Sequence, residues 1–202
     1  MLYRYRGAVL CLDSVLSLTR GSPVGAAALL GQLHPARGTF TGVCQADGQP
    51  ALIGQVAYVM GNRSARLSFI APESSPPTAG LTGLLEGLAW QAGEMGAFSL
   101  LGEVDEQSPS FEPARRAGFS VYAWQRVWRL SLPVEAGAKH AGWQPATSLD
   151  EQSVRNLFQM LVPPLVQSAE PLTNRKLNGL VYRQKGEVMG YVDCVYGPRG
   201  IY

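Results

Sequence analysis

The stretch that decides the fold runs from Gly80 to Leu130 and reads GLTGLLEGLAWQAGEMGAFSLLGEVDEQSPSFEPARRAGFSVYAWQRVWRL. Its first part predicts a helix from about Thr78 to Met95, stopped by Gly96, because apolar residues recur at helical spacing at Leu81, Leu84, Leu85, Leu88 and Ala92. The mostly apolar run from Ala97 to Val104 predicts a strand buried by that helix. A short helix ending at Gly118-Phe119 and a long aromatic strand follow, so the stretch predicts an α/β unit.

The residues before this stretch predict a small antiparallel sheet. From Thr39 to Ala71 the sequence alternates and is broken by Asp47-Gly48 and Gly61-Asn62, which predicts three strands joined as a meander. The third strand is expected to place Leu67, Phe69 and Ala71 on one face, with Arg66, Ser68 and Ile70 on the other. Together with the later strand, this order predicts a mixed sheet closed by a right-handed parallel crossover.

Short elements are expected ahead of the meander. Leu2 to Cys11 is strand-like, and Leu12 to Thr19 predicts a short helix in which Asp13 or Ser14 accepts an N-terminal amide. Pro23 to Leu33 predicts a second short helix that is ended by Pro35.

The last third of the chain repeats this opening order. We predict a domain over residues 1–132, a linker from Pro133 to Gly142, and the N-terminal half of a second domain of the same type over 143–202. In that half, a strand at Trp143 leads into a capped helix that stops before Pro163-Pro164. A hairpin turning at Lys185-Gly186 follows, and a further strand begins near Gly200. Half of an α/β domain cannot bury its sheet, so we expect residues 143–202 to pack on the first domain, on another chain or on further residues of the protein.

Composition excludes several classes of function. The 202 residues are 46% hydrophobic and 16% charged, as in a compact globular protein, and the net charge of +2 is too small to indicate nucleic acid or an anionic membrane as a partner. No apolar run is long enough to span a bilayer. The two histidines, His34 and His140, have no metal-ligand spacing around them. Three widely spaced cysteines predict reduced thiols, and therefore a cytoplasmic protein.

The order of elements over residues 1 to about 130 resembles a GNAT acyl-CoA N-acyltransferase domain, with a tandem, incomplete second domain after it. The resemblance implies that acetyl-CoA or another acyl-CoA lies along Arg66 to Ala71, contacting Phe69, Ile70 and Ala71. Aligning Leu84-Leu85-Glu86 with the usual L-L-E of the family places Pro76 to Leu81 on its pyrophosphate loop, Q/R-x-x-G-x-G/A. The implied cofactor residues there are Ser75, Thr78, Ala79, Gly80 and Leu81, at a helix N-terminus. Pro76 and Pro77 depart from the motif and remove two backbone donors.

The resemblance also implies a reaction, in which an amine attacks the thioester directly. Glu103 and Asp105 are the expected general bases, on one face near the end of their strand. Many members of the family carry a Tyr that acts as general acid toward the departing thiolate, and this chain has Ala114 at that position. Tyr122 is the nearest tyrosine that could take this role. Three hypotheses follow: an acyl-CoA-dependent N-acyltransferase acting on a small-molecule or peptide amine, a non-catalytic GNAT-like binding or assembly module, and a homo-oligomer in which the two regions exchange between chains.

Overall fold

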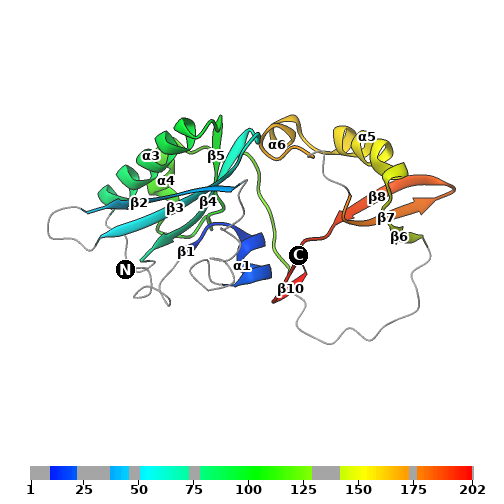
Figure 1. Cartoon of the computed structure of the whole chain (residues 1–202), viewed down its shortest axis with the longest axis horizontal. Coiled ribbons are helices and arrows are strands. Elements are labelled where there is room, and N and C mark those ends of the chain that lie inside the picture. The colour runs from blue at the N-terminus through cyan, green and yellow to red at the C-terminus, as the bar shows by residue number, and fades with distance from the viewer. Residues whose placement is uncertain are drawn as a thin grey trace. The chain divides into compact units, whose positions relative to one another are not determined.

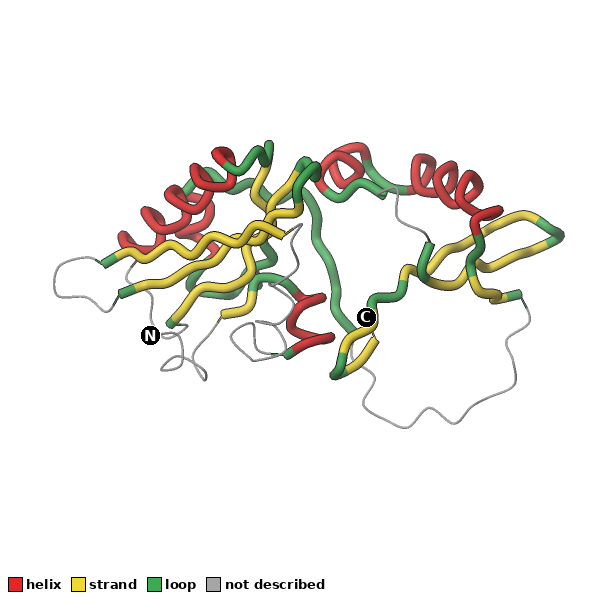
Figure 2. Tube along the Cα trace, in the orientation of Figure 1, coloured by secondary structure: helices red, strands yellow, loops and turns green. Residues whose placement is uncertain are grey.

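A computed structural model of the chain describes residues 10–21, 37–45, 51–72, 78–128, 142–172 and 177–201. Figures 1 and 2 show a mixed α and β protein. Its contacts divide the chain into two units: the first is Met1–Val121 with Gly197–Gly200, and the second is Tyr122–Tyr196 with Ile201–Tyr202.

The first unit holds a mixed sheet covered by a long helix. In chain order, its elements are β1 (Leu10–Cys11), α1 (Ser14–Arg20), β2 (Arg37–Cys44), β3 (Leu52–Val59), β4 (Ser64–Ala71), α3 (Thr78–Glu94), β5 (Ser99–Leu101) and α4 (Phe111–Arg116). The strand order is β1-β4-β3-β2, and β5 lies parallel beside the start of β4. The antiparallel meander β2-β3-β4 and the parallel return through α3 are therefore confirmed. The turn at Asp47-Gly48 lies outside the described residues.

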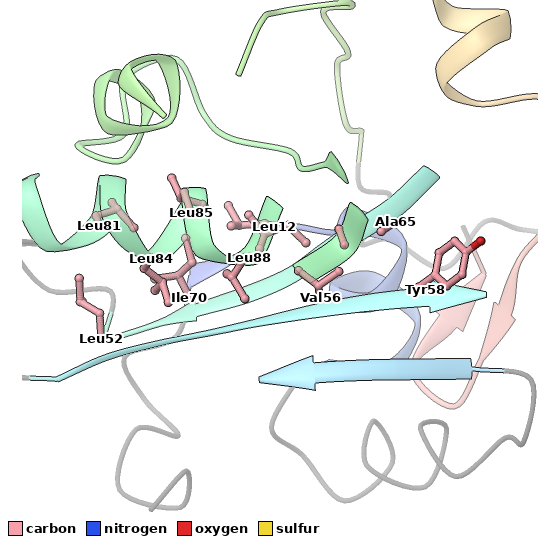
Figure 3. Close-up of a cluster of buried hydrophobic side chains, with 12 residues drawn as sticks. Leu12, Leu52, Val56, Tyr58, Ala65, Ile70, Leu81, Leu84, Leu85 and Leu88 are labelled. Carbon is pink, nitrogen blue, oxygen red and sulfur yellow. The ribbon is translucent and has the colours of Figure 1, made fainter. Parts of the chain in front are cut away.

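The apolar stripe predicted for α3 forms the core of this unit. Figure 3 shows Leu84 and Leu88 of α3 between the helix and the strands, and Leu52, Val56 and Ile70 of the sheet belong to the same buried cluster. Two glycines let the helix lie close to the strands, because a Cβ on Gly54 would come within 2.6 Å of Leu88 Cδ1, and one on Gly42 within 3.1 Å of Leu88 Cδ2. Gly96, at φ +97°, ends the helix as predicted.

A bulge in β4 breaks the predicted alternation of its side chains. Phe69 pairs with Gln55 and Leu67 with the next residue, Val56, so Ser68 is an extra residue in β4. Leu67 and Ile70 both join the cluster that packs against α3, whereas Phe69 does not. The prediction that Leu67 and Ile70 lie on opposite faces is therefore wrong, because the inserted residue shifts the alternation by one.

Two predicted strands are shorter than expected or unpaired. The strand expected from Ala97 to Val104 is limited to Ser99–Leu101, and the chain leaves β4 after Leu101. The long aromatic strand expected after Gly118-Phe119 has no strand paired with it in the described part of the chain, up to Trp128, the last described residue of this range. Gly118 itself, at φ +89°, makes the turn out of α4.

The second unit is a small antiparallel sheet with helices. Its elements are β6 (Trp143–Pro145), a 3-10 turn (Ser148–Asp150), α5 (Glu151–Leu161), α6 (Pro164–Ala169), β7 (Gly179–Gln184) and β8 (Glu187–Asp193). Two short strands, β9 (Tyr196–Gly197) and β10 (Gly200–Ile201), each have one residue in either unit. The strand order is β6-β7-β8, and β9 pairs with β10. The predicted hairpin is confirmed, with Lys185 and Gly186 at φ 52° and 86°. Val154 of α5 and Val181 of β7 are buried.

A buried carboxylate joins the helix start to the hairpin in this unit. Asp150 accepts hydrogen bonds from the backbone N–H and the hydroxyl of Thr147, both at 2.8 Å, and pairs with Arg183 of β7. The backbone hydrogen bond from Thr147 is the main cause that lowers the pKa of Asp150, and the Thr147 hydroxyl and Arg183 add to it. The predicted capped helix is therefore present, with its cap also fixed to the sheet.

Some predictions fall on residues that the structure does not describe. These are the strand over residues 2–9, the helix from Pro23 to Leu33 and the linker residues before Gly142. Within the described ranges, no helix combines the length and the apolar character needed to cross a membrane.

Candidate functional site

The candidate site is the outer edge of β4, because the family resemblance assigns acyl-CoA to this strand. On its inner side β4 pairs with β3, through Ile53 with Ala71 and Gly54 with Ile70. On its outer side β5 pairs with the first residues of β4, from Ser64 to Arg66. The last part of the outer side pairs with β1, through Leu10 with Ile70 and Cys11 with Phe69.

Leu12 extends this pairing and connects β4 to the chain that follows β5. Its N–H donates to the carbonyl of Ser68, the bulged residue, at 3.1 Å, and its carbonyl accepts from the N–H of Glu103 at 3.0 Å. The side chain of Leu12 is 2% exposed and belongs to the core cluster. We call these two hydrogen bonds the Leu12 bridge. The backbone of Leu12 therefore occupies the space between β4 and the segment after β5.

Glu103 is positioned by the first turn of α1. Its Oε2 accepts from the backbone N–H of Ser14 at 3.0 Å and from the Ser14 hydroxyl, while its Oε1 lies 4.0 Å from Arg66 Nη1. Asp13 accepts from the N–H of Leu16 at 2.9 Å, as the N-cap. The first turn of a helix has N–H groups without intrahelical acceptors, so the two carboxylates together satisfy two of them. The position of Glu103 is that of an additional helix cap.

Asp105 lies in a different environment from Glu103. Its side chain is exposed, and its Oδ1 accepts from the N–H of Gln107 at 2.8 Å within the turn that leads to α4. The prediction that both acids stand on one face of a strand is wrong, because the strand ends at Leu101 and both residues follow it. The turn conformation directs Asp105 to its own backbone.

Tyr122 belongs to the second unit, whereas the two acids belong to the first. Its hydroxyl donates to Glu170 Oε1 at 2.5 Å, just after α6. The partners that the structure gives the three predicted catalytic residues are different: Ser14 and Arg66 for Glu103, the N–H of Gln107 for Asp105, and Glu170 for Tyr122.

The residues that the resemblance assigns to the cofactor are mostly core residues. Phe69, Ile70 and Ala71 are buried, and so are Gly80 and Leu81 on α3. Gly80 faces the sheet, since a Cβ there would lie 3.4 Å from Leu52 Cδ1. Thr78 and Ala79 are the first residues of α3, and Ser75 lies outside the described residues. Burial leaves only backbone atoms of β4 as possible ligand contacts, and β1 and Leu12 use part of them.

Sequence reasoning missed Leu12 and Ser14 as part of this site. Ser14 was recognisable as a helix-capping candidate, but its partner is 89 residues later, at Glu103, and no local pattern reports such a distance. Among the residues that the structure describes, no group of three or more His, Cys, Asp and Glu side chains is arranged to hold a metal ion. Comparison with protein-family models, with curated proteins and with solved structures gives no match to this chain.

Proposed function

We propose that the first unit is a non-catalytic GNAT-like binding or assembly module. The observation that carries the proposal is the Leu12 bridge. In the family that the sequence resembles, the outer edge of this strand carries acyl-CoA, whereas here the chain itself makes hydrogen bonds to Ser68 and Glu103 at that edge.

Energetics favour the segment of the chain over a cofactor at this edge. Acyl-CoA could reach the β4 backbone only by displacing β1 and exposing Leu12. Exposing one leucine costs about 1.5–3 kcal/mol, and each lost backbone hydrogen bond costs roughly 1 kcal/mol. A total of about 3–5 kcal/mol would lower the apparent affinity for acyl-CoA by two orders of magnitude or more.

The environment of Glu103 supports the same conclusion. A general base must approach the proton of the incoming amine within hydrogen-bonding distance. One oxygen of Glu103 already accepts two hydrogen bonds from Ser14, and the other faces Arg66. A carboxylate held in this way stabilises α1, and both of its oxygens already face groups of the chain itself.

The second candidate function is acyl-CoA-dependent N-acyltransfer, by direct attack of an amine on the thioester. It is favoured by the partial exposure of Arg66 and Glu103, at 39% and 25% of their side chains. Displacement of β1 would open the outer edge of β4 and release the carboxylate of Glu103 beside it. The protein would then be an enzyme whose site opens only when the segment moves.

Calorimetric titration of the full chain with acetyl-CoA, paired with an acetyl-transfer assay on a panel of amines, tests the proposal. We expect no heat of binding, no thermal shift at millimolar acetyl-CoA and no transfer. We also expect Glu103→Gln to lower the free energy of unfolding by about 1 kcal/mol, because it weakens the cap on α1.

The matched control is Asp105→Asn, which changes an exposed carboxylate in a turn. The proposal is rejected if the protein acetylates any amine with saturable kinetics. Loss of that transfer in Glu103→Gln but not in Asp105→Asn would then identify Glu103 as the base. A structure soaked with CoA gives an independent check, since density along Arg66 to Ala71 would support the enzyme.

A further inference from the structure

The segment from Ala123 to Trp128 has the sequence of a strand but no strand beside it. Its residues AWQRVW are aromatic, β-branched and alternating, the composition typical of a sheet. The segment is extended, yet in the described parts of the chain none of these six residues makes a backbone hydrogen bond. Figure 2 draws it as loop.

Its large apolar side chains are exposed. Trp124 is 66% exposed, Val127 45% and Trp128 80%, and Arg126 lies over the Trp128 ring at 6.0 Å. Burying a tryptophan contributes several kcal/mol, so a chain that leaves two of them in water on an unpaired strand is unusual for a monomer. Such an edge pairs readily with another chain.

The segment is held at its start. The hydroxyl of Tyr122 donates to Glu170, and the N–H of Phe119 donates to the carbonyl of Ala114 at 3.1 Å. These contacts fix the residues before Ala123, so the six residues that follow are presented in an extended form. A pre-extended strand loses less conformational entropy when it pairs than a flexible one does.

We propose that this segment pairs with strand β8 of a second copy of the chain, by reciprocal strand exchange. Strand β8 is at the end of the order β6-β7-β8, so among the described residues its outer side has no strand paired with it. Strand β8 has seven residues, so the six described residues of the segment can pair along most of it, over roughly 20 Å. Both belong to the second unit, yet within one chain they do not pair.

Charge selects β8 over the other long outer strand. The sequence of strand β8 carries two acids, Glu187 and Asp193, and no base, whereas the segment carries one base, Arg126, and no acid. The one charged residue in the sequence of strand β2, at the end of the larger sheet, is Arg37, which has the same sign of charge as Arg126. Met189 and Val192 of β8 are exposed apolar residues that the incoming tryptophans can cover.

The area available is enough for a stable dimer. Trp124 and Trp128 from each of two copies would bury roughly 600 Å², at about 150 Å² for each ring. The surface that they cover on the partner is of similar size. The sum, about 1,200 Å², is at the lower limit of specific interfaces. This inference does not rest on the function proposed for the first unit.

The test measures the molar mass of the full chain by light scattering at increasing concentration. We expect a monomer–dimer equilibrium, with tryptophan emission moving to shorter wavelength as the dimer forms. Gln125→Pro removes a backbone donor from the strand and should leave a monomer, whereas Gln125→Ala should still dimerise. Met189→Lys, which puts a charge on the outer strand, should also give a monomer, and Met189→Leu should not.

Mixing the two monomeric variants distinguishes loss of the interface from misfolding. Gln125→Pro keeps an intact β8 and Met189→Lys keeps an intact segment, so the mixture can form one of the two strand pairs, with half of the area, and should show weak association that neither variant shows alone. Two results overturn the proposal: a monomer at every concentration for the unmodified chain, or a dimer that survives Gln125→Pro. A dimer lost with Gln125→Pro but kept with Met189→Lys overturns the assignment to β8.

Discussion

Asp150 shows how one residue connects parts of the chain that are distant in sequence. Its carboxylate caps the helix start through Thr147 and pairs with Arg183, 33 residues later. It is buried, and the hydrogen bonds lower its pKa. Because the folded pKa lies below that of the unfolded chain, the stabilisation is present above about pH 4 and is lost as the pH falls through the folded value.

Asp150→Asn should therefore destabilise the second unit at neutral pH by about 2 kcal/mol, because charged hydrogen bonds are replaced by neutral ones. The difference between the variant and the unmodified chain should shrink in acid, as the pH falls below about 4 toward the lowered pKa of Asp150. Hydrogen exchange of β7 and β8 amides at the two pH values measures this. An equal difference at both values would show that the charge of Asp150 does not matter, and Asp105→Asn is the control.

Tyr191 gives the opposite dependence, in alkaline solution. Burial is the main cause that raises its pKa to about 12, and the hydrogen bond of its hydroxyl to Asp193 Oδ1 at 2.8 Å adds to it. The unfolded chain loses this proton near about pH 10 and the folded chain keeps it. Stability therefore falls as the pH rises from about 10 to 12.

Tyr191→Phe should remove that part of the alkaline loss of stability. In a spectrophotometric titration, one of the eight tyrosines of the unmodified chain should ionise late, and this late step should be missing from the variant. Complete ionisation of the unmodified, folded protein by about pH 11 would contradict the assignment.

At the scale of elements, close packing of α3 on the sheet depends on which glycines touch it. Gly54 lies under Leu88, while a Cβ added to Gly83, on the outer side of α3, would have no other atom within 4 Å. The two glycines therefore have different reasons to be present: the first makes room for the helix, and the second only lowers helix propensity.

Gly54→Ala should destabilise the first unit by about 1–3 kcal/mol, because Leu88 must leave its position. Gly83→Ala should stabilise it by roughly 0.5–1 kcal/mol. Chemical denaturation of both variants measures the contrast. Combining Gly54→Ala with Leu88→Ala should cost less than the sum of the two single changes, since the shortened side chain makes room for the methyl group. Strict additivity would show that the two positions do not touch.

Elements with strong local patterns were predictable from the sequence. The helical spacing of Leu81 to Ala92 predicted α3, and Lys185-Gly186 predicted the hairpin of the second unit. The bulge at Ser68 was not predictable, because apolar residues face both sides of β4 and an inserted residue therefore does not change the hydrophobic pattern in a recognisable way. Strand β5 is shorter than the apolar run from Ala97 to Val104. After Leu101 the chain pairs with Leu12, through the N–H of Glu103, and no local pattern in the sequence reports this contact.

At the scale of the whole molecule, the two proposals concern different units and can fail separately. Acetyl-CoA binding tests the outer edge of β4 in the first unit, and molar mass tests Ala123 to Trp128 in the second.

The candidate site was only partly predictable from the sequence, because its contacts join residues that are far apart along the chain. Glu103 was selected by its position at a strand end, but its partners Leu12 and Ser14 come from far away in sequence, and the partner of Tyr122 is Glu170.

The Leu12 bridge also sets an order for folding on the ribosome. Leu12 is synthesised before both of its partners, Ser68 and Glu103, which follow it by more than fifty residues. The segment must wait, unpaired, until β4, α3 and β5 have left the exit tunnel, and closing so long a loop is slow. The part of the described chain that is made first is thus among the last to find its place.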